Sequence, residues 1–364
     1  MKIGIITVHR AHNCGAMLQA LALQESLKRL GHTPVLVEAN AIGEWKTIPE
    51  IPTYWKCWPF YIKDLILSMG IRSRKVMMFK RFLRHMSLSP KYNTAKEIPE
   101  AEYDAFIVGS DQVWNLDIVK DATLFLLEFC RDKKKKMAYA ASFGVTQIPS
   151  SWTQPYCTAL AQFSAITVRE DQAAELVQSL IGLKPHVVLD PTLLLVAQDY
   201  ARYESVRLIK QPYVLVYSIG AASEYMLELG RRISEKKNLK LVFVNATSFG
   251  NWLRIFNEYQ LISPDRFLSY IKHAECVVCT SYHATIFSLH YRRPFLTILP
   301  KGSHVTSRLI SLLSKLGLEG HLLCEGAVVE NVEMRMDADF NNVHDRIDIL
   351  RQKSVSELRE MTKG

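Results

Sequence analysis

One histidine in the sequence lies at a position where its side chain could take part in chemistry. His283 follows a short apolar run at residues 276–279, CVVC, and the hydroxyl pair Thr280 and Ser281. Such a run is typical of a strand that is buried on both faces, and residues 282–292 have the spacing of a helix. His283 would then lie where a strand's carboxyl end meets a helix's amino end, which is where open α/β sheets bind ligands.

The chemistry available at such a turn involves an anion and a proton. The free N–H groups and the positive end of a helix dipole favour phosphate above other groups, and a histidine can transfer a proton near neutral pH. A capping serine beside a partly exposed histidine with no catalytic role would produce the same local pattern. Local sequence leaves both interpretations open.

A second polar cluster follows the apolar segment 103–109. It runs from Ser110 to Asn115 and includes Asp111, Gln112 and Trp114. A tryptophan face can stack on a sugar ring, and the polar side chains can bond its hydroxyls. A turn capped by the aspartate would give the same spacing.

Two further positions carry polar groups after predicted strands. Arg169 follows the apolar segment 165–168 and is a candidate for holding a carboxylate or phosphate, although a surface salt bridge would look the same. His12 and Asn13 lie in the loop after the first strand and suit recognition of a polyol or sugar. That loop has one glycine, Gly15, where a dinucleotide fingerprint needs three, which argues against a nicotinamide or flavin enzyme.

The elements that must position these residues alternate between strand and helix. A chain of 364 residues suggests two domains. We expect an α/β fold with two Rossmann-like domains, at 1–200 and 205–330, that face a central cleft lined by the carboxyl ends of their strands. A helix within 340–364 would return to the first domain.

Residues 41–100 differ from this pattern because aromatic and then basic residues dominate them. One interpretation is a helical insertion that packs on the first sheet with a solvated basic face. Another is a pair of helices that touches an anionic membrane surface. Single-stranded nucleic acid would also suit this pattern, but nothing else in the chain supports it, so no nucleic-acid partner is expected.

Composition limits the class of protein. Hydrophobic residues make up 48% and the net charge is +9, which indicates a globular chain with an anionic partner or simply a soluble surface. We find neither a membrane-span-length apolar run nor a signal peptide, and expect a cytoplasmic protein, with peripheral contact at the inner membrane face left open. The odd count of seven cysteines argues against a disulfide framework, and the CxxC at 276–279 is better explained by buried strand thiols than by a metal or redox site.

Several blocks of the sequence, taken together, resemble the polysaccharide pyruvyl transferases. They include ITVHRAHNCGAMLQALALQ, YDAFIVGSDQVWN, YAASFG, ITVREDQ, VLDPTLLL, TSYHATIFSLHYRRPFLTI and SRLISLLSKLGL. The resemblance implies a fold like that of the GT-B glycosyltransferases. It also implies transfer of a pyruvyl group from phosphoenolpyruvate to a sugar, usually as a ketal and often on a lipid-linked glycan, in capsule or exopolysaccharide synthesis. No nucleotide, redox cofactor or metal is implied.

The resemblance also assigns roles to residues. In the family's Ser-Arg-x-His pattern, His283 matches the histidine that binds phosphoenolpyruvate and serves as general acid/base, while Thr280 and Ser281 occupy the serine and arginine positions. Arg169 resembles the family's other arginine for this donor. The expected donor site is Arg169, Ser281, Tyr282, His283, Lys301 and Arg308, with Lys301 and Arg308 replacing the missing charge. The expected acceptor site is His12, Asn13, Ser110, Asp111, Gln112 and Trp114.

Two other functions remain open from the residues themselves. A glycosyltransferase that uses a nucleotide sugar would have the same fold. A non-catalytic protein that binds glycans or phosphate would also fit, although it would not need both His283 and Arg169.

Overall fold

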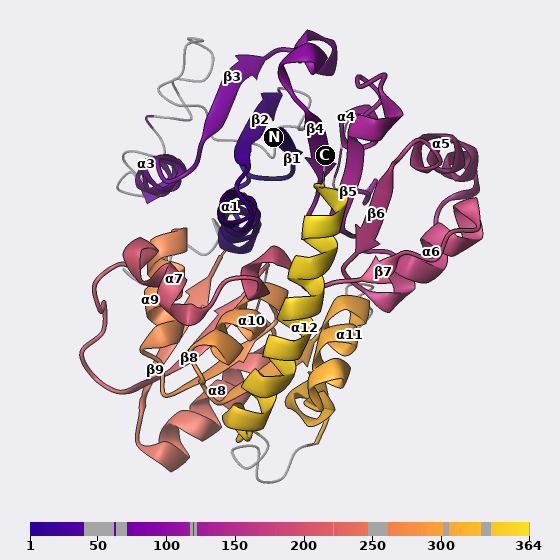
Figure 1. The fold of residues 1–364 in the computed structure, drawn as a ribbon. Helices are drawn as coiled ribbons and strands as arrows, with labels where there is room; N and C mark the ends of the chain where they lie inside the picture. The colour runs from indigo at the N-terminus through magenta and orange to yellow at the C-terminus, as the bar shows by residue number, and fades with distance from the viewer. Residues whose placement is uncertain are drawn as a thin grey trace.

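The computed structural model describes residues 1–39, 62, 71–116, 119, 122–220, 222–246, 261–300, 306–328 and 336–363. These residues form two parallel sheets with helices packed around them (Figure 1). The predicted α/β fold with two Rossmann-like domains facing a central cleft is confirmed.

The first sheet has seven strands within the described residues, in the order β3-β2-β1-β4-β5-β6-β7, and all its pairs are parallel. Its order reverses between β1 and β4, as in the Rossmann fold. The strands are β1 (Lys2–Ile6), β2 (Thr33–Ala39), β3 (Leu88–Tyr92), β4 (Ala105–Val108), β5 (Lys136–Ala141), β6 (Ala165–Val168) and β7 (His186–Val187).

The second sheet has five described strands, in the order β12-β11-β10-β8-β9, which are also parallel. Read from β9, this is the 2-1-3-4-5 order of doubly wound folds, and it reverses between β8 and β10. The strands are β8 (Tyr213–Ser218), β9 (Lys240–Asn245), β10 (Cys276–Cys279), β11 (Phe295–Leu299) and β12 (Leu322–Cys324). Both thiols of β10 are free and buried.

Helices connect and cover the strands. In the first half they are α1 (Cys14–Arg29), α3 (Ile71–Leu83), α4 (Ala122–Phe125), α5 (Ser150–Leu160), α6 (Asp171–Ile181) and α7 (Ala197–Tyr200). In the second half they are α8 (Glu224–Lys237), α9 (Pro264–Lys272), α10 (Tyr282–His290), α11 (Thr306–Leu316) and α12 (Phe340–Met361).

Two of these helices begin at side-chain caps that matter for the site. Ser281 caps α10 by accepting a hydrogen bond from the Ala284 N–H at 3.3 Å. Asn13 caps α1 by accepting from the Gly15 and Ala16 N–H groups at 2.9 and 3.3 Å. Helix α1 therefore begins at Cys14, directly after the asparagine cap.

The two halves share one apolar core. Helix α1 of the first half packs against α9 and α10 of the second. One core cluster includes Ile5 and Leu21 from the first half and Phe287 and Leu313 from the second. The base of the cleft is therefore closed by continuous apolar contact.

Helix α12 runs from the second sheet to the first (Figure 1). It begins at an Asp339 cap. Near this end, Nε2 of His344 lies 2.9 Å from the carbonyl oxygen of Leu289 on α10. Further along, the Ser354 hydroxyl accepts a hydrogen bond from the N–H of Leu189, after β7, at 3.0 Å. The helix thus contacts both halves.

The segment 41–100 is only partly a helical insertion. Its described part includes α3, but residues 88–92, which the sequence analysis placed in the insertion, form β3 and pair in parallel with β2 at the sheet edge. The strand pattern was weak because Pro90 interrupts it, and proline is tolerated at an edge. The aromatic residues 45–61 lie outside the described residues.

Candidate active site

A cavity of about 300 Å³, called here the cleft cavity, lies at the carboxyl ends of both sheets. Residues that line it come directly after β1 and β4 of the first sheet and after β8 and β10 of the second. In each sheet, the strand order reverses between these two strands. Ligands bind at such switch points in open α/β sheets. The polar lining consists of Asn13, Asp111, Gln112, Thr280, Ser281, Tyr282, His283 and Arg308.

His283 lies in the first turn of α10, where the Ser281 cap fixes the start of the helix. Its side chain is nearly buried, and Nε2 has no hydrogen-bond partner but lies 3.7 Å from Oδ2 of Asp190. On its Nδ1 side the imidazole meets Gly15 of α1, and a Cβ at residue 15 would collide with the ring. A glycine is needed there because α1 and the imidazole approach so closely.

Asp190 is a buried carboxylate with a full set of donors. Oδ1 accepts hydrogen bonds from the N–H and hydroxyl of Thr192 at 3.0 and 2.7 Å. Oδ2 accepts from the Ser110 hydroxyl at 3.1 Å and from Nη1 of Arg169 at 2.8 Å. Burial by itself would raise its pKa, but His283, Arg169 and these bonds outweigh burial and hold the pKa well below its usual range. An ionised carboxylate therefore faces the imidazole.

Arg169 is surrounded by three carboxylates. Besides Asp190, its guanidinium lies 3.3 Å from Asp111 and 3.8 Å from Glu170. Burial disfavours its charge, but the carboxylates reverse that effect and raise its pKa, so it stays positive. Its guanidinium carbon lies 4.8 Å from the centre of the Tyr282 ring. Arg169 lines a second cavity behind Tyr282 rather than the cleft cavity.

Among the described residues, Arg308 is the lysine or arginine that lines the cleft cavity. Its Nη1 lies 3.8 Å from Oδ1 of Asp111, and its Nε has no hydrogen-bond partner. In the amide orientation that turns its oxygen toward this side chain, Gln112 accepts from Nη2 at 3.0 Å. Burial and the nearby Arg169 lower the Arg308 pKa, an effect that an anionic ligand would relieve.

The structure brings most of the predicted site residues together. Ser281, Tyr282, His283, Arg308, Asn13, Asp111 and Gln112 line the cleft cavity. Ser110 is buried and instead supports Asp190. Lys301 lies outside the described residues.

Two predicted acceptor residues lie elsewhere. Trp114 is buried in the core of the first domain, where its Nε1 donates to the Phe125 carbonyl at 3.2 Å and its ring lies 5.1 Å from that of Phe143. The prediction that it stacks on a sugar is wrong, because its turn directs it inward. His12 packs 5.2 Å from the Phe79 ring on α3 and does not line the cleft cavity, and burial, followed by a neighbouring lysine, lowers its pKa to about 4.

Sequence reasoning missed Asp190, Glu170 and Gly15 as site residues. Asp190 had a usable signal, since it follows the apolar segment 187–189 as the other site residues follow their strands. Glu170 directly follows Arg169, and burial raises its pKa despite that arginine. The role of Gly15 could not be predicted, because it depends on the approach of α10 from the other domain.

Two other site types were searched for in the described part of the chain. No group of histidine, cysteine and carboxylate side chains there is arranged to hold a metal ion. None of the described helices is both long and apolar enough to cross a bilayer.

Comparisons with known proteins agree with this geometry. No curated protein matches the chain. Among solved structures, UDP-N-acetylglucosamine 2-epimerase from Rickettsia bellii has a TM-score of 0.50 at 10% identity, with 98% of this chain and 95% of that one covered. The UDP-GlcNAc 2-epimerase of Methanocaldococcus jannaschii has a TM-score of 0.50 at 11% identity, with 96% and 92% covered. These likenesses show the GT-B-like fold alone.

A family model supplies what the fold cannot. The model for polysaccharide pyruvyl transferase matches residues 13–302, a range that contains β4, β8 and β10 and most of the cleft cavity lining. The chain therefore belongs to the polysaccharide pyruvyl transferase family.

Proposed function

We propose that this protein moves the pyruvyl group of phosphoenolpyruvate onto two hydroxyls of a sugar as a ketal. The observation that carries the proposal is the position of His283, which lies in the cleft cavity beside Arg308 and the amino end of α10. An acid and an anion site are thus next to each other. Family membership supports pyruvyl transfer, and the donor and the ketal product are our inference.

The donor carries a phosphate and a carboxylate. Arg308 supplies one cationic contact, since its Nε has no acceptor. The N–H groups of the first turn of α10 supply another, because a helix leaves these donors without partners inside itself. Arg169 lies behind Tyr282 and holds the carboxylate of Asp190 rather than the donor, and Lys301 remains a candidate for a further cation.

The reaction requires acid catalysis at carbon. His283 delivers a proton to the terminal methylene, and a sugar hydroxyl oxygen attacks the cationic central carbon. The C–O bond to phosphate breaks and phosphate leaves with the electron pair. A second hydroxyl then closes the ring. Of the two hydroxyl protons, one ends on the new methyl group and one on phosphate, so His283 is regenerated. A positioned acid contributes about 100- to 10,000-fold.

Asp190 acts as a positioning residue in this scheme. It stays ionised and lies 3.7 Å from Nε2 of the imidazole, so its charge can hold the ring in the orientation that proton delivery needs. Ser110, Thr192 and Arg169 hold the carboxylate in place.

The acceptor enters from the first-domain side. Asn13, Asp111 and Gln112 line that wall and can bond sugar hydroxyls. We propose a lipid-linked oligosaccharide as the acceptor, in capsule or exopolysaccharide synthesis.

The exposed face of α3 supports contact with an anionic membrane surface. Arg74, Arg81 and Arg84 are exposed at helical spacing, and Met77 between them is 64% exposed. Each basic residue near such a surface is worth about 1 kcal/mol. Co-sedimentation with vesicles that contain anionic lipid should fall for the Arg74→Glu/Arg81→Glu variant, and unchanged sedimentation would contradict this contact.

The test is direct product analysis. The protein is incubated with phosphoenolpyruvate and a panel of lipid-linked sugars, and the products are examined for phosphate release and a mass gain of one pyruvyl ketal. UDP, GDP and CMP sugars serve as the comparison donors. Release of nucleotide with no phosphate released from phosphoenolpyruvate would overturn the proposal in favour of a glycosyltransferase.

A further inference from the structure

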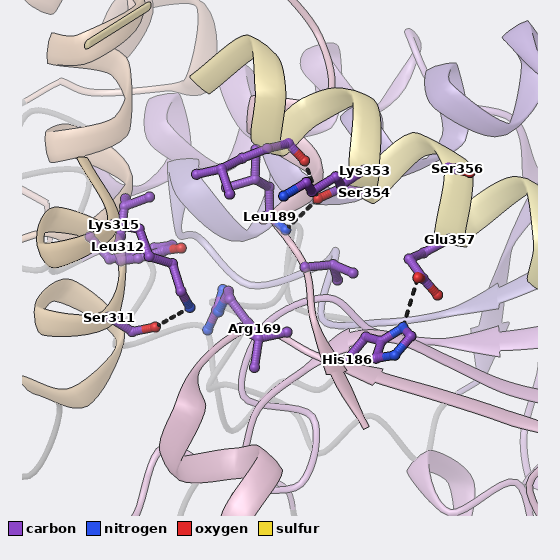
Figure 2. A pocket seen from close by; sticks show the side chains of 14 residues that line it. Arg169, His186, Leu189, Ser311, Leu312, Lys315, Lys353, Ser354, Ser356 and Glu357 are labelled. Carbon is purple, nitrogen blue, oxygen red and sulfur yellow. Dashed lines mark hydrogen bonds and ion pairs between the residues drawn. The ribbon is translucent and has the colours of Figure 1, made fainter. Parts of the chain in front are cut away.

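A second cavity, of about 400 Å³, has Tyr282 in its lining but not His283, and Figure 2 shows the side chains around it. We call it the α12 cavity. Residues 186–189 of the first half, α11 of the second half and the C-terminal helix α12 enclose it. Tyr282 lines both cavities, and Arg169 lines only this one. Its volume falls within the range of small-molecule sites, about 300–1,000 Å³.

Most of the polar groups in the α12 cavity are donors. Lys353 and Ser356 line the cavity from α12, and within the described part of the chain neither side chain makes a hydrogen bond or ion pair. Lys315 of α11 bonds the Ser311 hydroxyl at 2.9 Å and Asp171 at 3.0 Å. Figure 2 shows Lys315 and Ser311 on the same side of the cavity as Arg169.

The carboxylates near this cavity are already paired. The one that lines it, Glu357, lies 2.7 Å from Nδ1 of His186 (Figure 2). Asp171, which pairs with Lys315, has a largely exposed side chain, and exposed ion pairs of this kind are worth about 0–1 kcal/mol. A ligand anion can therefore replace Asp171 at Lys315 at little cost.

The remaining wall is apolar. Val188, Leu189, Leu312 and Leu350 also line the cavity. An inorganic ion would leave these side chains uncovered, whereas a ligand with an apolar part would remove them from water. A lining of aliphatic side chains with a few hydrogen-bond donors is usual for a site that binds a small organic molecule.

We propose that the α12 cavity binds a small phosphate monoester whose organic part is apolar. The phosphate would lie between Lys315 and Lys353, with the Ser356 hydroxyl as a further donor. The ligand would touch both halves of the molecule and α12. It would also lie against Arg169, which bonds Asp190, the carboxylate that faces His283. A bound ligand would therefore affect the cleft cavity through the Arg169 side chain.

The test uses phenyl phosphate as the probe, with inorganic phosphate and benzyl alcohol as partial probes, in isothermal titrations on the full chain. Phenyl phosphate should bind more tightly than either. Lys353→Ala should weaken it about tenfold, the loss expected for one hydrogen bond to a charged group. Ser356→Phe, which places a ring at the cavity wall, should weaken it at least as much.

Arg359→Ala is the matched control, because it removes one positive charge from the exposed surface of the same helix outside the cavity. It should bind phenyl phosphate like the unmodified chain. Undiminished affinity in both Lys353→Ala and Ser356→Phe, no saturable binding, or equal binding of benzyl alcohol would each overturn the proposal. Lys353 and Ser356 do not line the cleft cavity, so this result is independent of the proposed transfer reaction.

Discussion

Residues 110–114 and residues 280–283 follow β4 and β10, two buried strands at the switch points of their sheets. After β10 the chain enters α10 at once, and all four residues line the cleft cavity. After β4 it makes an irregular turn, in which Asp111 has a φ of 78°. There Ser110 points to Asp190 and Trp114 enters the core, while Asp111 and Gln112 line the cavity.

The difference shows what a position after a strand can predict. Both segments reach the sheet edge, as expected from parallel strands. A regular helix start gives its first residues predictable positions, because its first turn has a fixed geometry. An irregular turn distributes them in several directions, and packing selects which of them reach the ligand.

We expect the largest loss of activity from a change in residues 280–283, the segment that follows β10. His283→Ala should lower kcat for phosphate release from phosphoenolpyruvate by about 1,000-fold, since it removes the acid. Steady-state kinetics measures this, and thermal melting checks that the fold is kept. His85→Ala, at an exposed histidine outside both cavities, is the control and should keep full activity. If His283→Ala turned over nearly as fast as the control, residues 280–283 would have no catalytic role that distinguishes them from residues 110–114.

The next largest effect is expected at Asp190. Ser110, in the segment that follows β4, donates a hydrogen bond to its carboxylate. Asp190→Asn should lower kcat by about 100-fold, within the range for positioned proton transfer. KM for phosphoenolpyruvate should change little, because Asp190 does not line the cleft cavity, and thermal melting checks that the fold is kept. A lower melting temperature that accounts for the lost activity would mean that Asp190 supports only the fold.

Two variants within residues 110–114 distinguish a side chain that lines the cleft cavity from one that is buried in the core. Gln112→Ala should raise KM for the acceptor about fivefold, the loss of one neutral hydrogen bond, with little change in stability. Trp114→Phe should leave KM unchanged and lower the free energy of unfolding by about 1–3 kcal/mol, because it loses the bond to Phe125 and buried area. Kinetics and urea denaturation measure the two effects, and a raised KM in Trp114→Phe would return this residue to the acceptor site.

The smallest expected effect concerns the other end of α10. His290 is buried, its Nε2 lies 2.8 Å from the Thr192 carbonyl oxygen, and burial lowers its pKa to about 4. The unfolded chain takes up a proton below about 6.5 while the folded chain does not, so stability falls as the pH falls from about 6.5 to about 4.

His290→Gln should lose that part of the pH dependence. Between about pH 7.5 and about pH 5, its unfolding free energy should fall by up to about 2 kcal/mol less than that of the unmodified chain. Urea denaturation at both pH values measures the difference. Equal losses would show that His290 titrates as freely as an exposed histidine, unlike the packed residue seen here.

Much of the fold could be predicted because its signals are local. The predicted strand at 165–168 agrees with β6 at both ends, since its apolar run has clear boundaries. β3 was missed because an edge strand with Pro90 has no such run. The site, like the fold, could be predicted only where its signals are local. Ser281, Tyr282 and His283 follow a clear strand and line the cavity, whereas the burial of Trp114 depends on Phe125 and Phe143, which are distant in the sequence.

The sequence by itself determined the parallel sheets, the position of His283 at a helix start and the family to which the chain belongs. These depend on apolar periodicity, caps and residue order, which are properties of short segments. Only the tertiary structure decided that Asp190 and Gly15 meet the imidazole, that Arg169 is held by three carboxylates, and that a second cavity lies behind Tyr282. The physical reason is that these contacts join segments from both halves, and their geometry is set by how the two sheets and α12 pack together.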